Sequence, residues 1–254
     1  MKIAIVQSES IWENPSANRT LFDEKFNTIL PETDLIVLPE MFTTGFTMQP
    51  QFCAESMDGP TVVWMQSWAK KLHAALIGSI AVEDNGHFYN RLFFVHPDGK
   101  LEIYNKRHRF TLAGEHQVYT AGKERLIVTY KGWKICPLIC YDLRFPAYSR
   151  NTENYDILLY VANWPQPRIQ AWDLLLRARA VENMCYTLGV NRVGQDGNNH
   201  CYVGHSQAID CFGNYSLAPQ QNDAIYYVEL NKKTLEENRK KFPFLEDRDT
   251  IHWD

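Results

Sequence analysis

Hydrophobic and polar positions alternate along the chain in two periods, one typical of strands and the other typical of amphipathic helices. Short apolar runs bounded by turn residues predict strands at residues 2–7, 34–38, 75–82, 87–96, 101–105, 125–130, 133–139, 156–162, 185–191, 206–210 and 224–229. Helical spacing predicts helices at residues 17–30, 60–73, 147–152, 169–184 and 232–241. Strand-like and helix-like segments therefore alternate through nearly the whole sequence, as in an α/β fold.

Turn residues between the early strands predict that part of the sheet is antiparallel. Residues 84–86 (DNG) and 97–99 (PDG) are both strong hairpin signals. The sequence contains no internal linker, low-complexity run or short-period repeat. Since 45% of the 254 residues are hydrophobic, we expect residues 1–254 to form a single domain with a substantial core.

Composition and charge narrow the class of partner. The formal net charge is −4, and the lysines and arginines are scattered, so no basic patch for a nucleic acid is expected. No run of about 18 apolar residues indicates a membrane span, and the chain enters a strand-like segment at its first residues. The six cysteines form no dense disulfide pattern. We therefore expect a cytoplasmic protein with free thiols and a small-molecule or protein partner.

Cys140 ends an apolar run and is followed by turn and helix-start signals. A thiol at the tip of a strand projects from a rigid element, and the backbone N–H groups just after it are free to face a developing oxyanion. This arrangement is typical of a nucleophile. The alternative is that Cys140 is a small buried hydrophobic residue, which is the commoner fate of a lone cysteine.

Three charged residues occupy comparable positions. Glu40 follows the strand predicted at residues 34–38, Lys106 follows the strand at 101–105, and Glu115 lies in the long loop beyond. The ends of buried strands are where open α/β sheets place their sites. The alternative is a helix cap or loop charge for Glu40, a loop charge for Glu115 and a solvated side chain for Lys106.

Three motifs that contain these residues resemble the nitrilase superfamily of carbon–nitrogen hydrolases, whose catalytic set is Glu-Lys-Cys. They are residues 38–40 (LPE), 104–108 (YNKRH) and 139–146 (ICYDLRFP), in the order that the family has them. The resemblance extends along essentially the whole chain. Within the superfamily, residues 161–165 (VANWP) and 177–183 (RARAVEN) are most similar to the ω-amidases.

The resemblance implies a four-layer α-β-β-α sandwich with mixed sheets, usually paired through its helical faces into a homodimer. It implies that Glu40, Lys106 and Cys140 are catalytic and that no cofactor or metal is needed. It also implies hydrolysis of the terminal amide of short dicarboxylic monoamides such as 2-oxoglutaramate and succinamate. Two residues depart from the pattern: Arg109 stands where relatives tend to have an apolar residue, and Cys136 is a second cysteine in the nucleophile strand.

The chemistry of amide cleavage assigns a role to each group. A thiol with a pKa of about 8.5 is only ~3% ionised at pH 7, so it needs a base, and Glu40 is available. An ammonium about 4 Å from sulfur stabilises the thiolate by roughly 4 kcal/mol at an effective dielectric of about 20, so we expect Lys106 to favour the thiolate. Lys106 and the backbone N–H of Tyr141 would hold the oxyanion. The resemblance implies that Glu115, which matches a second glutamate in the family's long loop, orients Lys106 or the substrate.

A substrate carboxylate requires a cation. Arg109 and Arg168 are the candidates, because a guanidinium binds a carboxylate with two parallel hydrogen bonds. Arg144 is a further candidate, with bracing of the nucleophile turn as its alternative role. Trp164 is expected to form a pocket wall, and packing in the core is the alternative.

Several other functions are alternatives to this one. Residues 204–208 (GHSQA) resemble a serine-nucleophile elbow, but a strand-like segment follows instead of the required helix. The eight histidines show no close pairing for a metal. Cys136 would be the resolving thiol of a redox protein. Another amidase, a carbamoylase, a nitrilase, or a thiol-bearing binding or scaffold protein without turnover are the remaining alternatives.

Overall fold

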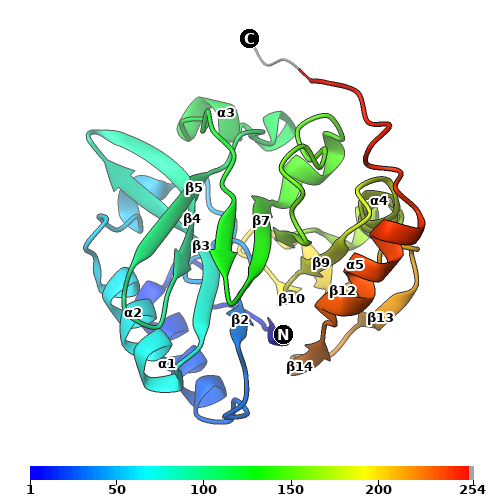
Figure 1. Cartoon of the computed structure of the whole chain (residues 1–254). Helices are drawn as coiled ribbons and strands as arrows, with labels where there is room; N and C mark the ends of the chain where they lie inside the picture. The colour runs from blue at the N-terminus through cyan, green and yellow to red at the C-terminus, as the bar shows by residue number, and fades with distance from the viewer. Residues whose placement is uncertain (252–254) are drawn as a thin grey trace.

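The computed structural model describes residues 1–251, and two six-stranded mixed sheets form its centre (Figure 1). The first sheet has the strand order β14-β1-β2-β3-β4-β5, with β1 (Lys2–Gln7), β2 (Leu35–Val37), β3 (Ala75–Asp84), β4 (His87–Val95), β5 (Leu101–Asn105) and β14 (Ala224–Glu229). The second has the order β13-β12-β9-β8-β7-β6, with β6 (Val128–Tyr130), β7 (Trp133–Ile139), β8 (Ile157–Val161), β9 (Tyr186–Val190), β12 (Ser206–Ile209) and β13 (Tyr215–Gln220). A small hairpin joins β10 (Val193–Gln195) to β11 (Cys201–Val203).

The strands at the centre of each sheet are parallel. In the first sheet β1, β2 and β3 run in the same direction, whereas β4, β5 and β14 are antiparallel to their neighbours. In the second sheet β7, β8 and β9 are parallel, and the outer strands are antiparallel. The buried, Ile- and Val-rich sequences of β2 and β8 are typical of parallel strands covered on both faces.

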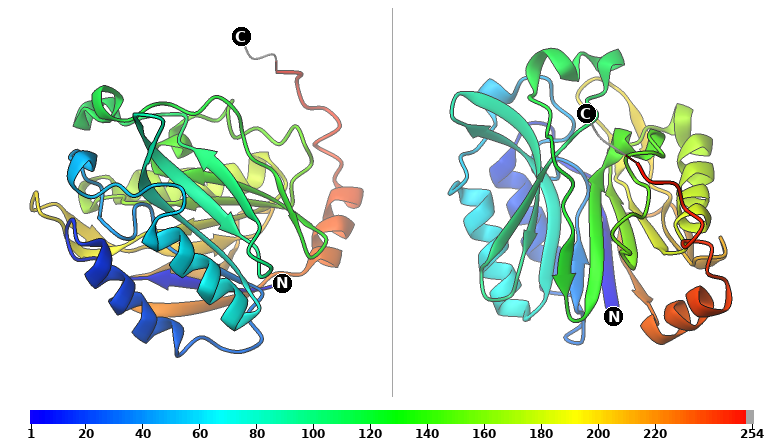
Figure 2. Two further views of the ribbon diagram at one scale, coloured as in Figure 1. Left: turned by 90° about the vertical axis from the view of Figure 1, so that its left-hand side faces the viewer. Right: turned by 45° about the horizontal axis from the view of Figure 1, so that its top comes forward.

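Helices cover the outer face of each sheet, and the sheets pack against each other (Figure 2). The helices are α1 (Pro15–Phe26), α2 (Pro60–Leu72), α3 (Glu115–Val118), α4 (Ile169–Glu182) and α5 (Lys232–Lys241). The pair α1 and α2 lies against the first sheet, and α4 and α5 lie against the second. The predicted α-β-β-α sandwich with mixed sheets is confirmed.

One predicted helix is wrong. Residues 147–152 contain a turn and a bend but no helix, and the helical segment near them is a short 3-10 helix, Cys140–Arg144. The Arg125 guanidinium explains the difference, because its Nη1 donates to the carbonyl oxygens of Tyr148 (2.6 Å) and Arg150 (2.8 Å). Carbonyl groups that a helix would use internally therefore bond to a side chain instead.

Strands β10, β11 and β13 were not expected. β13 is an edge strand that contains Pro219 and has mostly partly exposed or exposed side chains, so it lacks the apolar run on which strand prediction depends. The predicted strand at residues 125–130 begins only at Val128. Within residues 1–251, no helix has the length and apolarity that crossing a membrane requires.

Candidate active site

Cys140 is held in a strained backbone conformation directly after β7. Its φ is +45°, in the left-handed region that non-glycine residues seldom occupy, and it begins the 3-10 helix Cys140–Arg144. Such strain persists only where surrounding contacts enforce it. The sharp turn from strand to helix points the thiol into a cavity, whereas Ile139 just before it is fully buried.

Asp142 enforces this turn through four hydrogen bonds. Its Oδ2 accepts from the Ile139 backbone N–H (3.0 Å) and from the Tyr104 hydroxyl (2.8 Å). Its Oδ1 bonds to the His108 backbone N–H (3.0 Å) and imidazole Nδ1 (2.8 Å). Because Tyr104 and His108 flank Lys106, the same carboxylate fixes the lysine segment beside the nucleophile turn.

Glu40 lies three residues after β2 and is 1% exposed. Its Oε1 accepts from Lys106 Nζ and from Asn90 Nδ2, both at 2.8 Å. Its Oε2 accepts from the Asn163 backbone N–H at 2.8 Å, and the Asn163 side chain donates to the Glu40 carbonyl oxygen at 2.7 Å. Asn163 follows β8 in the second sheet, so these bonds join the two sheets at the site.

Lys106 is shared between two carboxylates. Its Nζ lies 2.8 Å from Glu40 Oε1 and 3.0 Å from each carboxylate oxygen of Glu115. Glu115 is fully buried, and its Oε2 also accepts from the Phe110 backbone N–H. Glu115 does not line the cavity with Cys140, and it contacts Lys106 from behind.

The electrostatics of the cluster favour a charged lysine and a protonated thiol. Burial acts to lower the pKa of Lys106, but the carboxylates of Glu115 and Glu40 outweigh it, and the pKa is raised. Burial raises the pKa of Glu115, against the opposing effect of the Lys106 ammonium. Burial and the Glu40 carboxylate raise the pKa of the Cys140 thiol well above its usual range, and Lys106 only partly opposes them. Lys106 therefore acts in the expected direction, toward the thiolate, but burial and the Glu40 carboxylate outweigh its effect on the pKa of Cys140.

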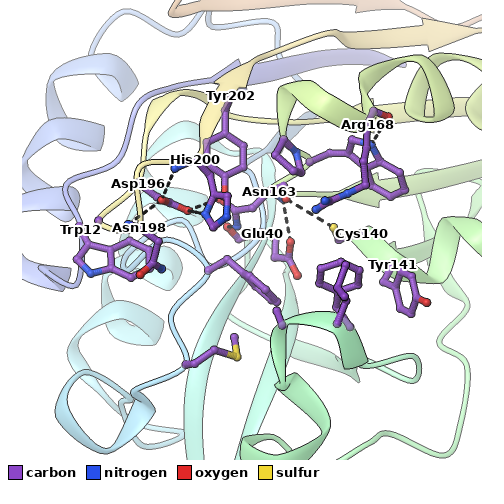
Figure 3. A pocket seen from close by; sticks show the side chains of 18 of the residues that line it. Trp12, Glu40, Cys140, Tyr141, Asn163, Arg168, Asp196, Asn198, His200 and Tyr202 are labelled. Carbon is purple, nitrogen blue, oxygen red and sulfur yellow. Dashed lines mark hydrogen bonds and ion pairs between the residues drawn. The ribbon is translucent and has the colours of Figure 1, made fainter.

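A cavity of about 610 Å³ opens above Cys140 (Figure 3). Glu40, Lys106, Tyr141, Trp164 and Arg168 all line it, as the sequence led us to expect of catalytic or substrate-binding residues. Its volume is in the range of about 300–1,000 Å³ typical of small-molecule sites. The cavity therefore brings together most of the residues singled out from the sequence.

Arg109 is the exception among the predicted substrate-binding residues. It is not among the residues that line the cavity, and its Nη1 donates to the carbonyl oxygens of His116 (3.3 Å) and Tyr119 (3.2 Å). The guanidinium thereby holds the loop that carries Glu115. These two hydrogen bonds explain why position 109 is an arginine. They do not bring its guanidinium to a ligand in the cavity.

Arg168 and Arg144 supply cations to the cavity wall. The Arg168 guanidinium lies 5.1 Å from the Phe110 ring centre, and the Arg144 guanidinium lies 5.1 Å from that of Trp164. Neither forms an ion pair within the described part of the chain. Trp164 is only 3% exposed and also packs on Trp172, so it is both a wall and a core residue.

Cys136 differs from Cys140 in its surroundings. It is fully buried in the hydrophobic core, and burial raises the pKa of its thiol. Both cysteines are free thiols. Among residues 1–251 there is also no group of three or more His, Cys, Asp or Glu side chains that could hold a metal ion.

Sequence reasoning missed the polar residues that orient the reactive groups. Asn90 and Asn163 hold the Glu40 carboxylate, and Asp142 and His108 brace the nucleophile turn. His108 and Asp142 belong to the motifs quoted for the resemblance, so their buried pairing was within reach of the sequence. Asn90 lies within a strand and gave no signal of its own.

The fold and this cluster define an α/β protein with a buried carboxylate–lysine–thiol group at the sheet edge, and comparison with known proteins gives its family. The family model described as carbon–nitrogen hydrolase matches residues 2–240. The chain therefore belongs to the carbon–nitrogen hydrolase family, which confirms the resemblance to the nitrilase superfamily.

Characterised relatives and solved structures agree with this assignment. The chain is 43% identical to the omega-amidase YafV of Yersinia enterocolitica, over 98% of this chain and 97% of the relative. It is 32% identical to the 2-oxoglutaramate amidase of Bacillus subtilis, over 96% of each. The crystal structure of a CN-hydrolase superfamily protein from Xanthomonas campestris, with an arsenic adduct in its active site, is 41% identical and superposes with a TM-score of 0.98, covering 100% of this chain and 99% of that one. Nit3 of Saccharomyces cerevisiae, a nitrilase superfamily member, is 25% identical with a TM-score of 0.86, covering 96% of this chain and 94% of that chain.

Proposed function

We propose that this protein is an ω-amidase, a thiol hydrolase that converts the terminal amide of a short dicarboxylic monoamide to the acid and ammonia. The observation that carries the proposal is the cavity that is lined by Glu40, Lys106 and Cys140 and has two cationic side chains in its wall. The identity to omega-amidases along nearly the whole chain supports it. The substrates we favour are 2-oxoglutaramate and succinamate.

The first half of the reaction forms a thioester. The Cys140 sulfur attacks the amide carbon while Glu40 takes the thiol proton, since the raised pKa of the thiol keeps that proton in place until attack. Lys106 and the backbone N–H of Tyr141 stabilise the oxyanion; the first turn of a helix leaves such an N–H without an internal partner. Glu40 then passes the proton to the leaving nitrogen, and ammonia departs.

The second half hydrolyses the thioester. Glu40 accepts a proton from a water molecule that attacks the acyl carbon, and the same proton returns to the sulfur as the acid leaves. Asn90 and the backbone N–H of Asn163 hold one carboxylate oxygen of Glu40 each, so the base keeps one orientation in both halves. Glu115 keeps Lys106 in place through both steps.

Arg168 and Arg144 are the proposed partners of the distal substrate carboxylate. Both guanidinium groups line the cavity, and neither is neutralised by a carboxylate of the described chain. The Trp164 ring forms the wall beside Arg144. A guanidinium bound to a carboxylate by two hydrogen bonds gives both affinity and orientation, which places the terminal amide over Cys140.

The test is ammonia release from 2-oxoglutaramate, succinamate and a simple nitrile, by the native protein and by Cys140→Ala. We expect rapid release from the two carboxylated amides and none from the variant, with an unchanged circular dichroism spectrum. Cys201→Ala is the matched control, because Cys201 is an exposed cysteine that does not line the cavity. Full amidase activity in Cys140→Ala would overturn the proposal.

Assembly and location belong to the same proposal. Paired helical faces would make a homodimer, and α4 carries outward-facing apolar side chains, Leu174 (70% exposed) and Val181 (48% exposed), that a partner would cover. Light scattering should give twice the mass of the chain, and Leu174→Glu should halve it. The free cysteines suit a reducing compartment, so we place the protein in the cytoplasm, which cell fractionation would test.

A further inference from the structure

The cavity continues well beyond the reacting groups. In Figure 3, Cys140 and Arg168 lie on one side of Glu40, whereas Trp12 and His200 lie on the other. The whole volume of about 610 Å³ corresponds to on the order of twenty water molecules at roughly 30 Å³ each. A five-carbon monoamide that spans from Arg168 to Cys140 leaves the half beyond Glu40 unfilled.

The position of Glu40, which must protonate the leaving nitrogen, determines which part of the substrate lies in this second half of the cavity. Glu40 must reach the leaving nitrogen to give it a proton, so that nitrogen lies on the Glu40 side of the scissile bond. The acyl chain then extends the other way, toward Arg168. Anything attached to the amide nitrogen therefore projects past Glu40, toward Trp12 and His200.

Close packing and hydrogen bonds hold the wall of this second half in place. The Trp12 indole packs so closely on two glycines that a Cβ at Gly45 would lie 2.9 Å from the ring, and a Cβ at Gly197 would lie 2.5 Å from it. The buried Arg192 joins the two segments involved, because its Nη2 donates to the carbonyl oxygens of Ser10 (3.3 Å) and Gln195 (3.1 Å). An aromatic surface held this firmly is suited to contact a ligand.

Polar groups complete the far end. Asp196 bonds to His200 Nδ1 (3.2 Å) and accepts from the Tyr202 hydroxyl (2.9 Å), and both of these side chains line the cavity. The bond to Asp196 fixes the imidazole through Nδ1, and Nε2 has no partner within residues 1–251. An apolar or aromatic group beside Trp12 with a polar end near His200 matches this surface.

We propose that the half of the cavity beyond Glu40 is a leaving-group subsite, and that the enzyme hydrolyses N-substituted ω-amides and releases a primary amine. This inference rests on the proposed ω-amidase function. The sulfur–carbon bond forms as Cys140 attacks, the carbon–nitrogen bond breaks, and the thiol proton reaches the nitrogen through Glu40. The amine leaves through the subsite, and water then supplies the hydroxyl of the acid and returns one proton to the sulfur.

Three substrates with the same acyl half test the inference: succinamate, N-methylsuccinamate and N-benzylsuccinamate. Succinate release is measured for each, since it is common to all three. We expect the native enzyme to hydrolyse the benzyl amide with a kcat/KM at least equal to that of the methyl amide, because the ring occupies the subsite. Hydrolysis of succinamate with neither N-substituted amide cleaved would overturn the subsite and leave the ω-amidase function standing.

Two variants locate the contact. Trp12→Ala should lower the ratio of kcat/KM for the benzyl amide to that for succinamate by about tenfold or more, the size of a lost apolar contact in a pocket. His200→Ala is a second variant on a side chain that is 60% exposed and outside the core, and it should lower the ratio in the same direction. Phe52→Ala, which removes an exposed aromatic ring outside the cavity, is the control and should leave the ratio unchanged.

The outcomes separate the two proposals. A ratio that stays the same in both Trp12→Ala and His200→Ala would overturn the subsite, whatever the absolute rates. Cleavage of the benzyl amide without cleavage of succinamate would overturn the ω-amidase function and support the subsite. Failure of all three substrates would overturn both.

Discussion

Replacing Asp142 with asparagine should unfold the nucleophile turn with almost no change in side-chain volume. Each carboxylate oxygen of Asp142 accepts one backbone N–H, from His108 or from Ile139, at 3.0 Å in both cases. The Tyr104 hydroxyl and the His108 imidazole can exchange donor and acceptor roles, but a backbone N–H cannot. An asparagine has one oxygen, so in either orientation its NH2 group faces a backbone N–H.

The magnitude follows from these contacts. One buried N–H left unpaired costs about 1–3 kcal/mol. Hydrogen bonds to a charged acceptor are roughly twice as strong as neutral ones, so the three remaining bonds weaken by about 2 kcal/mol together. The sum is a loss of about 4 kcal/mol of stability. At about 2–4 °C per kcal/mol for a chain of this size, the melting temperature of Asp142→Asn should fall by about 8–16 °C.

Thermal unfolding followed by circular dichroism measures this shift, and ammonia release from succinamate measures its effect on Cys140. Asp98→Asn is the matched control, because exposed Asp98 accepts a single backbone N–H from Lys100 at 3.0 Å and should shift the melting temperature by no more than about 2 °C. A shift of less than about 3 °C in Asp142→Asn, with normal turnover, would refute the view that this carboxylate enforces the strained turn.

Substitutions in the charged cluster and at one glycine should each change alkylation, turnover or solubility in a defined direction. Because the Glu40 carboxylate helps to raise the pKa of the Cys140 thiol, Glu40→Gln should move the pH midpoint of Cys140 alkylation by iodoacetamide downward, while amide turnover falls by about 10²-fold or more. Glu115→Gln removes one of two charges that hold Lys106 and should lower kcat by about 10²-fold with KM changed less, because the oxyanion contact is loosened. Gly122→Ala would place a Cβ 2.0 Å from the backbone carbonyl oxygen of Asn105, so the variant should be expressed largely insoluble.

Each of these changes has a control on the surface of the chain. Glu83→Gln alters an exposed glutamate and should affect neither alkylation nor turnover. Gly86→Ala meets no atom within 4 Å, so only its φ of +75° matters, and it should remain soluble with a stability loss of about 1 kcal/mol. An alkylation midpoint that rises in Glu40→Gln, undiminished kcat in Glu115→Gln, or a soluble and stable Gly122→Ala would each contradict the corresponding argument.

The sequence singled out three side chains that the structure brings together in one cavity, because they are local features of strand ends. Glu40 and Cys140 follow β2 and β7, which pair with parallel neighbours, and Lys106 follows the edge strand β5, which is antiparallel to β4 and so runs in the same direction as β3. The same reasoning led to the α/β architecture. It did not lead to β13 or to the turns at residues 147–152, where a side chain or an edge position replaces the apolar pattern.

Residues that depend on distant partners could not be predicted in the same way. The bond from Asn163 to Glu40 joins positions 123 residues apart, and neither residue type specifies the other. Arg109 illustrates the opposite error, since a guanidinium near the site suggested a substrate carboxylate, whereas it bonds to two carbonyl groups of its own loop. The packing of the folded chain determines which group each of these side chains bonds to.

The charge balance of the cluster explains why the thiol is protonated at rest. Glu40 and Glu115 carry two negative charges against the one positive charge of Lys106, so a thiolate at Cys140 would add a further negative charge to a buried site. If Glu40 takes the thiol proton during attack, the negative charge that it gives up reappears on the substrate oxyanion, and the total does not change. Lys106 then contacts an oxyanion in place of one ionised carboxylate. Its positive charge therefore stabilises the transition state, and no additional charge enters the site.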